Sequence, residues 1–87
     1  MLYYINGEYI NAEDAQVPFN DAGFLYGDGL FETMRFDDIK FFSFEKHFNR
    51  LKKGLKIIDL SIPYTKNKIK NILETIIKKN SLESGII

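Results

Sequence analysis

The first 42 residues alternate short apolar runs with turn-forming residues, a pattern that predicts strands. Leu2–Ile5 and Glu8–Ile10 are two such runs, and only Asn6-Gly7 separates them. Both central residues of a type I′ turn take positive φ, which Asn and Gly tolerate better than other residues. The sequence therefore predicts a tight antiparallel hairpin at the start of the chain.

Four more short elements are expected before residue 43. Ala15–Val17 is predicted to be a third short strand. A glycine-rich stretch follows, in which Asn20 or Asp21 caps a single helical turn and the glycines prevent a longer one. Leu30–Phe36 and Ile39–Phe42 are then the arms of a second hairpin, with the turn at the two aspartates between them.

The rest of the chain carries apolar residues at helical spacing. Ser43 opens the first helix, and Thr65 caps the second, which is expected to end at Asn80. The two apolar stripes are Phe44, Phe48, Leu51, Leu55 and Ile58 on the first helix, and Ile69, Ile72, Leu73, Ile76 and Ile77 on the second. We predict an α+β fold in which a small antiparallel sheet packs against two helices.

The last seven residues, SLESGII, have the pattern of a strand that has just begun. We expect Ile86 and Ile87 to be too few to pair, and natural domains seldom end within an element. The sequence is therefore interpreted as one domain, residues 1–87, that forms the N-terminal part of a longer protein.

Composition excludes several kinds of site. The chain has no cysteine and one histidine, which excludes a disulfide scaffold, a thiol nucleophile and a cysteine-based or histidine-rich metal site. Aromatic residues make up 15% of the chain, which argues against disorder. No apolar run approaches the roughly 20 residues of a membrane span, and the N-terminus has no signal-peptide pattern. We expect a cytoplasmic protein with no membrane contact.

The zero net charge is the sum of two oppositely charged halves. Residues 1–45 carry nine acidic and two basic side chains, net −7, and residues 46–87 carry ten basic and three acidic ones, net +7. We favour lysines on the solvated faces of two helices and expect no nucleic-acid partner. A module that binds a polyanion with its basic half remains an alternative. Another alternative is a module that self-associates through exposed apolar surface.

Two stretches carry candidate chemistry. Gly23–Arg35 holds three glycines before a predicted strand, but it lacks both the Gly-Lys-Ser/Thr of a Walker A loop and the helix that follows a dinucleotide fingerprint. His47 and Arg50 lie three residues apart on a predicted helix and share a face, where the arginine fork can grip a phosphate. Without a ligand, Arg50 is a surface arginine and His47 bonds a neighbouring backbone group. Glu32 and Glu45 offer carboxylates, but nothing in the sequence pairs them.

Together these stretches resemble the class IV aminotransferases, enzymes of fold type IV that use pyridoxal 5′-phosphate (PLP). The segments that carry the resemblance span nearly the whole chain, and they are Tyr4–Gly7, Asn20–Phe24, Tyr26–Thr33 and His47–Leu51. The resemblance implies the N-terminal small domain of a homodimeric enzyme. It also implies amino-group transfer between an amino acid and a 2-oxo acid, as in branched-chain and D-amino acid aminotransferases.

The resemblance assigns roles to individual residues. Arg50 matches the arginine that holds the cofactor phosphate, and His47 matches its accompanying histidine, for which we expect a supporting role. Tyr26 and Phe31 match aromatic positions that line the substrate pocket, in part across the dimer interface. Arg35 occupies a position near the substrate side of the site. The Phe-Glu-Thr triplet that ends at residue 33 is more similar to the aminodeoxychorismate lyase group, which is the alternative reaction.

The resemblance also implies what this chain does not contain. In the family, the Schiff-base lysine and the glutamate that partners the cofactor's pyridinium nitrogen lie in the C-terminal domain, and none of the ten lysines here matches that position. We therefore expect no catalytic residue within the 87 residues. The chain alone is expected to be inactive, while the full-length protein is an enzyme.

Overall fold

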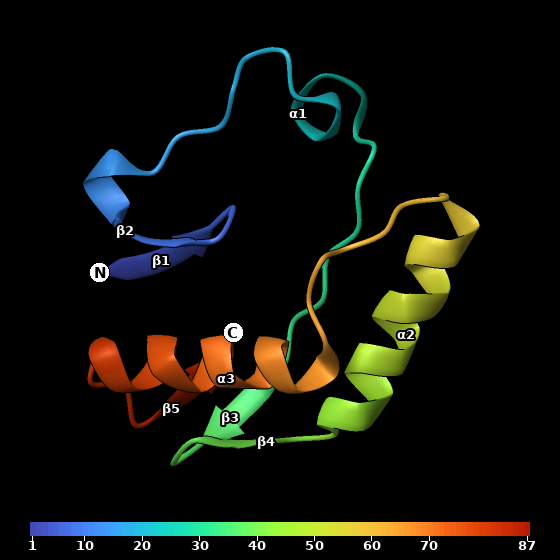
Figure 1. Ribbon diagram of the computed structural model, residues 1–87. Helices are drawn as coiled ribbons and strands as arrows, with labels where there is room; N and C mark the ends of the chain where they lie inside the picture. Colours follow the sequence, from blue (N-terminus) through green and yellow to red (C-terminus); the bar gives the residue numbers. More distant parts are fainter.

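The computed structural model describes all 87 residues and contains two small antiparallel sheets and three helices (Figure 1). Its elements in chain order are β1 (Leu2–Ile5), β2 (Glu8–Asn11), one 3₁₀ turn (Ala12–Asp14), α1 (Ala22–Tyr26), β3 (Arg35–Asp37), β4 (Lys40–Phe41), α2 (Phe44–Ile57), α3 (Lys66–Lys79) and β5 (Ser84–Ile86). The fold is α+β, as predicted, but the strands form two sheets and not one.

The predicted N-terminal hairpin is confirmed. β1 and β2 pair antiparallel with Ile5 opposite Glu8, which leaves Asn6-Gly7 as the two-residue turn. Both turn residues have positive φ, 50° at Asn6 and 92° at Gly7, as a type I′ turn requires. The hairpin is also joined to the segment between the two long helices, because the hydroxyls of Tyr4 and Tyr64 lie 3.5 Å apart.

The second sheet has the order β4-β3-β5, and its third strand contradicts the expectation that the chain's last residues cannot pair. β5 pairs antiparallel with β3, with Gly85 opposite Phe36. The ladder continues one residue further, because Met34 and Ile87 exchange both backbone hydrogen bonds, at 2.7 and 2.8 Å. The prediction gave too short a strand because it counted only the apolar residues. Ser84 and Gly85 also pair, since a polar or missing side chain does not prevent backbone pairing.

Three local predictions in the first half were wrong. Ala15–Val17 forms no strand, since no neighbouring chain offers it a ladder. Leu30–Phe36 was predicted to be the first arm of the second hairpin, but the strand covers Arg35–Asp37, and residues 30–33 make no backbone hydrogen bonds. The turn of this hairpin lies at Asp38 and Ile39, both at positive φ, because Asp37 pairs with Lys40.

The helix boundaries follow the sequence closely. Asp21 caps α1 by accepting a hydrogen bond from the Phe24 amide, and Gly27 ends it in the left-handed conformation that glycine adopts readily. Thr65 caps α3 in the same way, through a 3.1 Å bond from the Lys68 amide. Ser43 directly precedes α2 but makes no side-chain cap.

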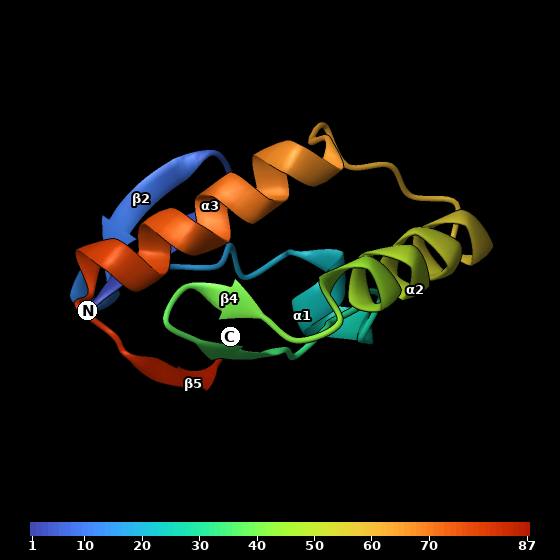
Figure 2. The same ribbon diagram turned by 90° about the horizontal axis from the view of Figure 1, so that it is seen from below.

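Helix α3 lies between the two sheets and supplies half of the core (Figures 1 and 2). Ile72 and Ile77 of α3, with Met34 and Phe36 of the strand segment, are the four buried residues, and the side chains of Phe36 and Ile77 are fully buried. Asn80 joins the end of α3 to β1, because its amide accepts from the Leu2 N–H at 2.7 Å and donates to the Leu2 carbonyl at 2.9 Å. None of the helices is long and apolar enough to cross a bilayer.

The region from Gln16 to Phe31 stands apart from this core. Every residue in it is exposed, including the aromatic rings of α1, and Figure 1 shows α1 on the opposite side of the molecule from α3. Exposed apolar side chains gathered in one segment usually mark a surface that another molecule or another part of the protein covers.

We expect Asn80→Ala to lower the free energy of unfolding by about 1–3 kcal/mol, because both backbone groups of Leu2 lose their partner at a partly buried site. Urea unfolding followed by circular dichroism measures this loss. Asn67→Ala is the matched control, since Asn67 is an exposed asparagine on the same helix. Equal stability of the two variants would contradict the role assigned to Asn80.

Candidate functional site

The segment that leads into β3 places its side chains alternately on two sides. Glu32, Met34 and Phe36 are at least partly buried, whereas Phe31, Thr33 and Arg35 are exposed. This alternation is the period of an extended chain, although residues 30–33 make no backbone hydrogen bonds. Side-chain contacts alone therefore hold this segment against the rest of the protein.

Glu32 contacts α2 through both of its carboxylate oxygens. Arg50 Nε donates to Glu32 Oε1 at 2.5 Å, and Arg50 Nη2 donates to Glu32 Oε2 at 2.7 Å. His47 Nδ1 lies 2.7 Å from the same Oε2. Because His47 and Arg50 are three residues apart on α2, one carboxylate reaches both of them.

This contact shifts the charge state of the carboxylate. Hydrogen bonds from Arg50 and then from His47 lower the pKa of Glu32 from 4.5 to about 2, so Glu32 is ionised at neutral pH. The same pair raises the pKa of Arg50. Since an ionised carboxylate can only accept, His47 Nδ1 carries the proton that is shared with Glu32, which fixes the orientation of the imidazole ring.

A glycine brings the segment close to α2. A Cβ placed at Gly54 would lie 2.8 Å from Leu30 Cδ1, closer than side-chain carbons approach one another. Gly54 is one helical turn beyond Arg50, so Leu30 packs over it while Glu32 bonds the preceding turn. The missing side chain thus helps to place Glu32 beside its two partners.

The predicted cofactor ligand is accessible. The Arg50 side chain is 71% exposed, whereas the Glu32 side chain is only 16% exposed. A guanidinium has five N–H donors, and Glu32 takes one on Nε and one on Nη2. Three donors remain, at the end of the side chain that faces away from Glu32.

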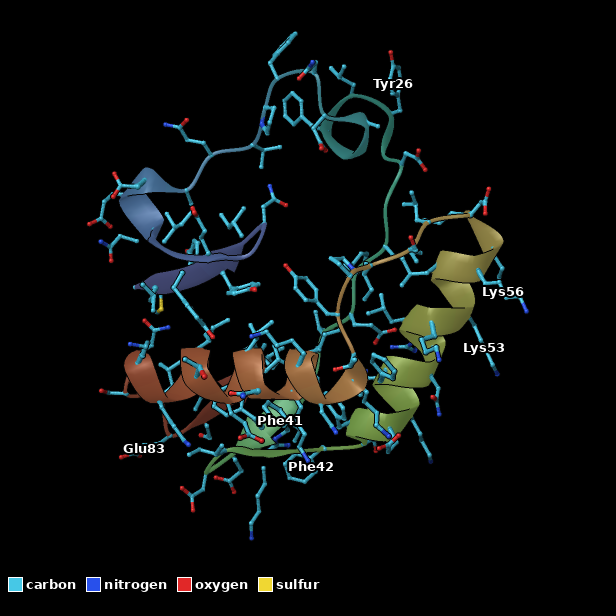
Figure 3. All side chains as sticks on the ribbon, in the orientation of Figure 1. Tyr26, Phe41, Phe42, Lys53, Lys56 and Glu83 are labelled. Atoms are coloured by element: carbon cyan, nitrogen blue, oxygen red, sulfur yellow. The ribbon has the colours of Figure 1, made fainter.

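The structure brings only one of the three predicted substrate residues near Arg50. Phe31 is 87% exposed and lines a small pocket of about 350 Å³ together with Glu32, Arg50 and Leu51. Arg35 lies on the same exposed side of the segment as Phe31, with its guanidinium carbon 5.6 Å from the centre of the Phe42 ring. Figure 3 shows Tyr26 on α1, pointing away from the rest of the chain.

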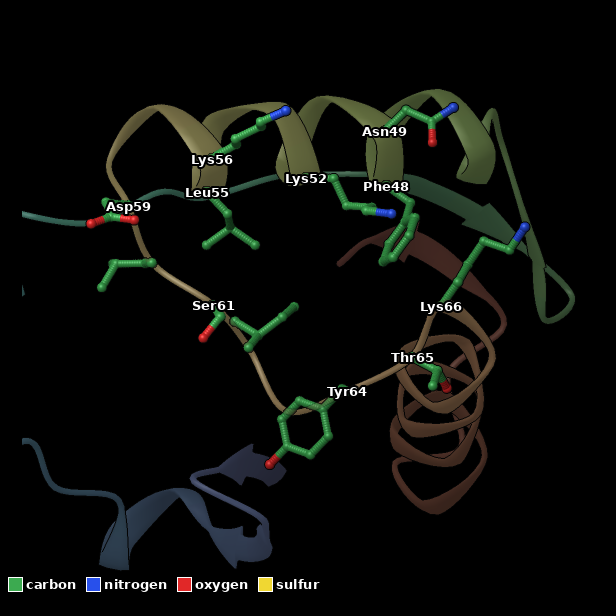
Figure 4. A pocket seen from close by; sticks show the side chains of 12 residues that line it. Phe48, Asn49, Lys52, Leu55, Lys56, Asp59, Ser61, Tyr64, Thr65 and Lys66 are labelled. Atoms are coloured by element: carbon green, nitrogen blue, oxygen red, sulfur yellow. The ribbon is translucent and has the colours of Figure 1, made fainter.

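The largest pocket, about 690 Å³, lies elsewhere. It is formed by α2 from Phe48 onward, the segment after it and the start of α3, with Leu55 directed into it, while the Tyr64 ring at its edge points towards the N-terminal hairpin (Figure 4). None of the predicted site residues lines it. We place the candidate site at Arg50 because that position has charged groups in contact, whereas this pocket has no such cluster.

Several lysines of the basic half contact neighbouring side chains. Lys66 pairs with Glu45 at 2.8 Å, while the ammonium groups of Lys52 and Lys70 lie 5.9 and 5.7 Å from phenylalanine rings. Lys53 and Lys56 point outward from α2 (Figure 3). The positive charges are thus spread over two helices, as expected for solvated helix faces.

Glu32 is the site residue that the sequence did not identify. His47 was expected to bond a neighbouring backbone group, but it bonds this carboxylate 15 residues away. The position of Glu32 beside Phe31 in the glycine-rich segment was visible in the sequence. Its pairing depends on how the segment crosses α2, for which a single sequence carries no signal.

Comparisons with known proteins agree with this arrangement. The family model for class IV amino-transferases matches residues 29–87, which include Glu32, His47 and Arg50. The chain belongs to the class IV aminotransferase family, and the resemblance noted in the sequence is confirmed.

Similar curated proteins are D-alanine aminotransferases. Those of Listeria monocytogenes and Staphylococcus epidermidis are each 35% identical to this chain, over 98% and 94% of its length respectively. The enzyme of Staphylococcus aureus is 29% identical over 97%. The chain spans 29% of the length of the first two relatives and 30% of the third.

The shifted pKa of Glu32 predicts a pH dependence of stability. Because the pKa is lower in the folded chain than the ordinary 4.5, the contribution of Glu32 is fully present above pH 4.5 and is lost as the pH falls towards 2. In Glu32→Gln the free energy of unfolding should therefore fall less steeply between pH 5 and pH 2 than in the wild type. Urea unfolding at several pH values measures both slopes.

The control for this measurement is Glu83→Gln, because Glu83 is exposed and belongs to none of the ion pairs. It should keep the wild-type slope. A Glu32→Gln slope equal to that of the wild type would show that the ion pair does not form in solution.

Proposed function

We propose that this chain supplies the cofactor-phosphate site of a PLP-dependent aminotransferase. Its family membership and the exposed guanidinium of Arg50 support this function. PLP, when bound, is the electron sink that allows an amino group to move between an amino acid and a 2-oxo acid. The reacting lysine is proposed to lie outside these 87 residues, in a region that corresponds to the part of the relatives that this chain does not match.

The residues at Arg50 fit a phosphate group. Three free N–H donors at the end of a permanently charged side chain suit a phosphate dianion, which accepts bidentate hydrogen bonds. Glu32 occupies the other edge of the guanidinium and holds it in one orientation. Arg50 and Phe31 line the same pocket, so a phosphate and an apolar group could bind next to each other.

We propose D-alanine as the amino donor. The named relatives that match nearly the whole chain are D-alanine aminotransferases, which favours amino-group transfer over the lyase alternative. The Phe-Glu-Thr triplet at residues 31–33 is the only sequence feature that pointed to the lyase group. Thr33, the last residue of this triplet, has an exposed side chain that makes no hydrogen bond in the structure.

We further propose that the functional protein is a homodimer that covers the exposed segment from Gln16 to Phe31. Tyr26 and Phe31 are 80% and 87% exposed, more than substrate-lining rings usually are. A second surface placed against them would complete a pocket that these residues cannot form alone. Arg35, on the same side as Phe31, would then also face the substrate.

We expect Arg50→Ala in the full-length gene product to weaken PLP binding roughly 10- to 100-fold, because two charge-assisted hydrogen bonds to phosphate are lost. Titration of the apoprotein with PLP, followed by its absorbance, measures the affinity. Lys53→Ala is the matched control, since Lys53 is an exposed cation three residues further along α2. Equal PLP affinity of the wild type and Arg50→Ala would remove Arg50 from this role.

The same preparation tests the reaction. With D-alanine and a 2-oxo acid, pyruvate should accumulate, whereas L-alanine should give little. Branched-chain amino acids serve as the comparison for the other aminotransferases of the family. Pyruvate release from aminodeoxychorismate without a 2-oxo acid acceptor would instead support the lyase reaction.

A further inference from the structure

Glu32 makes more contacts than a simple ion pair needs. Both of its oxygens are used, one by Arg50 Nε and the other by Arg50 Nη2 and His47 Nδ1. The carboxylate is mostly shielded from solvent while Arg50 is mostly exposed. An exposed arginine normally samples many rotamers, because its long side chain loses entropy when it is held in one.

We propose that Glu32 is a positioning residue for Arg50 and that His47 holds Glu32 in place. The two parallel bonds on Nε and Nη2 fix the plane and the direction of the guanidinium. The His47 bond prevents the carboxylate from rotating with the arginine. The donor edge made by Nη1 and Nη2 is thereby held towards solvent before any phosphate arrives, so binding does not have to order it.

This inference rests on the proposed function, because it takes the phosphate of PLP as the group that Arg50 binds. Glu32 also has an opposing effect, since its negative charge repels a phosphate dianion on the other side of the guanidinium. A variant that removes the charge would change the positioning and the repulsion together. The informative change therefore keeps the charge and alters only the reach of the side chain.

Glu32→Asp fulfils this condition, because aspartate has the same charge but is one methylene shorter and cannot span both Arg50 and His47 from the same backbone. In the full-length gene product, the affinities for PLP and for pyridoxal, which lacks the phosphate, are measured by titration of the apoprotein. We expect the PLP affinity of Glu32→Asp to fall about tenfold, the loss of one charge-assisted hydrogen bond, while the pyridoxal affinity stays within about twofold.

The ratio of the two affinities separates positioning from general damage. A partly unfolded variant would lose both ligands, whereas a misplaced Arg50 loses only the one with a phosphate. Glu83→Asp, at an exposed glutamate near β5, controls for the substitution and should keep the wild-type ratio (Figure 3). A wild-type ratio in Glu32→Asp would overturn the proposal.

A second variant keeps the test open if Glu32→Asp does not fold. His47→Gln removes one of the three bonds on the carboxylate but leaves the Arg50 pair, so a smaller fall of about threefold is expected, again for PLP alone. An unchanged ratio in this variant would overturn the proposal as well. If the wild type takes up no PLP, the proposed function is wrong. If the wild type binds PLP and the variants bind it equally well, only the positioning role of Glu32 is wrong.

Discussion

The contact of one carboxylate with two residues of a helix determines the geometry of the site. Residues 30–33 have no backbone hydrogen bonds, so the extended segment before β3 is held to α2 by the ion pair of Glu32 and by Leu30 over Gly54. Charge-assisted, bidentate bonds are the strongest that such a segment can make. They also set the direction in which Arg50 points and the tautomer of His47.

The remainder of the fold provides the frame for this contact. Four residues are buried, and two of them, Met34 and Phe36, continue the same alternation that turns Glu32 towards α2. β5 pairs with β3 on one side and α3 packs beside it, so the register of β3 is fixed at Phe36. Because successive side chains of an extended chain point to opposite sides, the inward position of Phe36 places Glu32 inward and Phe31 outward.

The segment from Gln16 to Phe31 is exposed throughout, in contrast to the buried residues around β3. It holds aromatic residues that a core would normally bury, yet it is tied to the chain chiefly through the short helix α1 and its cap. In the proposed dimer this segment becomes interior. The substrate side of the proposed site then depends on a second surface, while Arg50, the proposed phosphate ligand, is already held by Glu32 within these 87 residues.

Local patterns in the sequence determined the elements whose cause is local. The Asn6-Gly7 turn, the caps at Asp21 and Thr65, the end of α3 at Asn80 and both amphipathic helices follow from residues close together in the chain. The family motif predicted Arg50 as the phosphate ligand, and this role stays a proposal. Only the tertiary structure decided the rest. Pairing of β5 with β3 and of Glu32 with His47 and Arg50 joins residues 15 to 51 positions apart, and it depends on which backbones lie side by side. A glutamate that pairs and one that is solvated are the same residue type in the sequence, and the close approach of Leu30 to Gly54 helps to bring Glu32 to both His47 and Arg50.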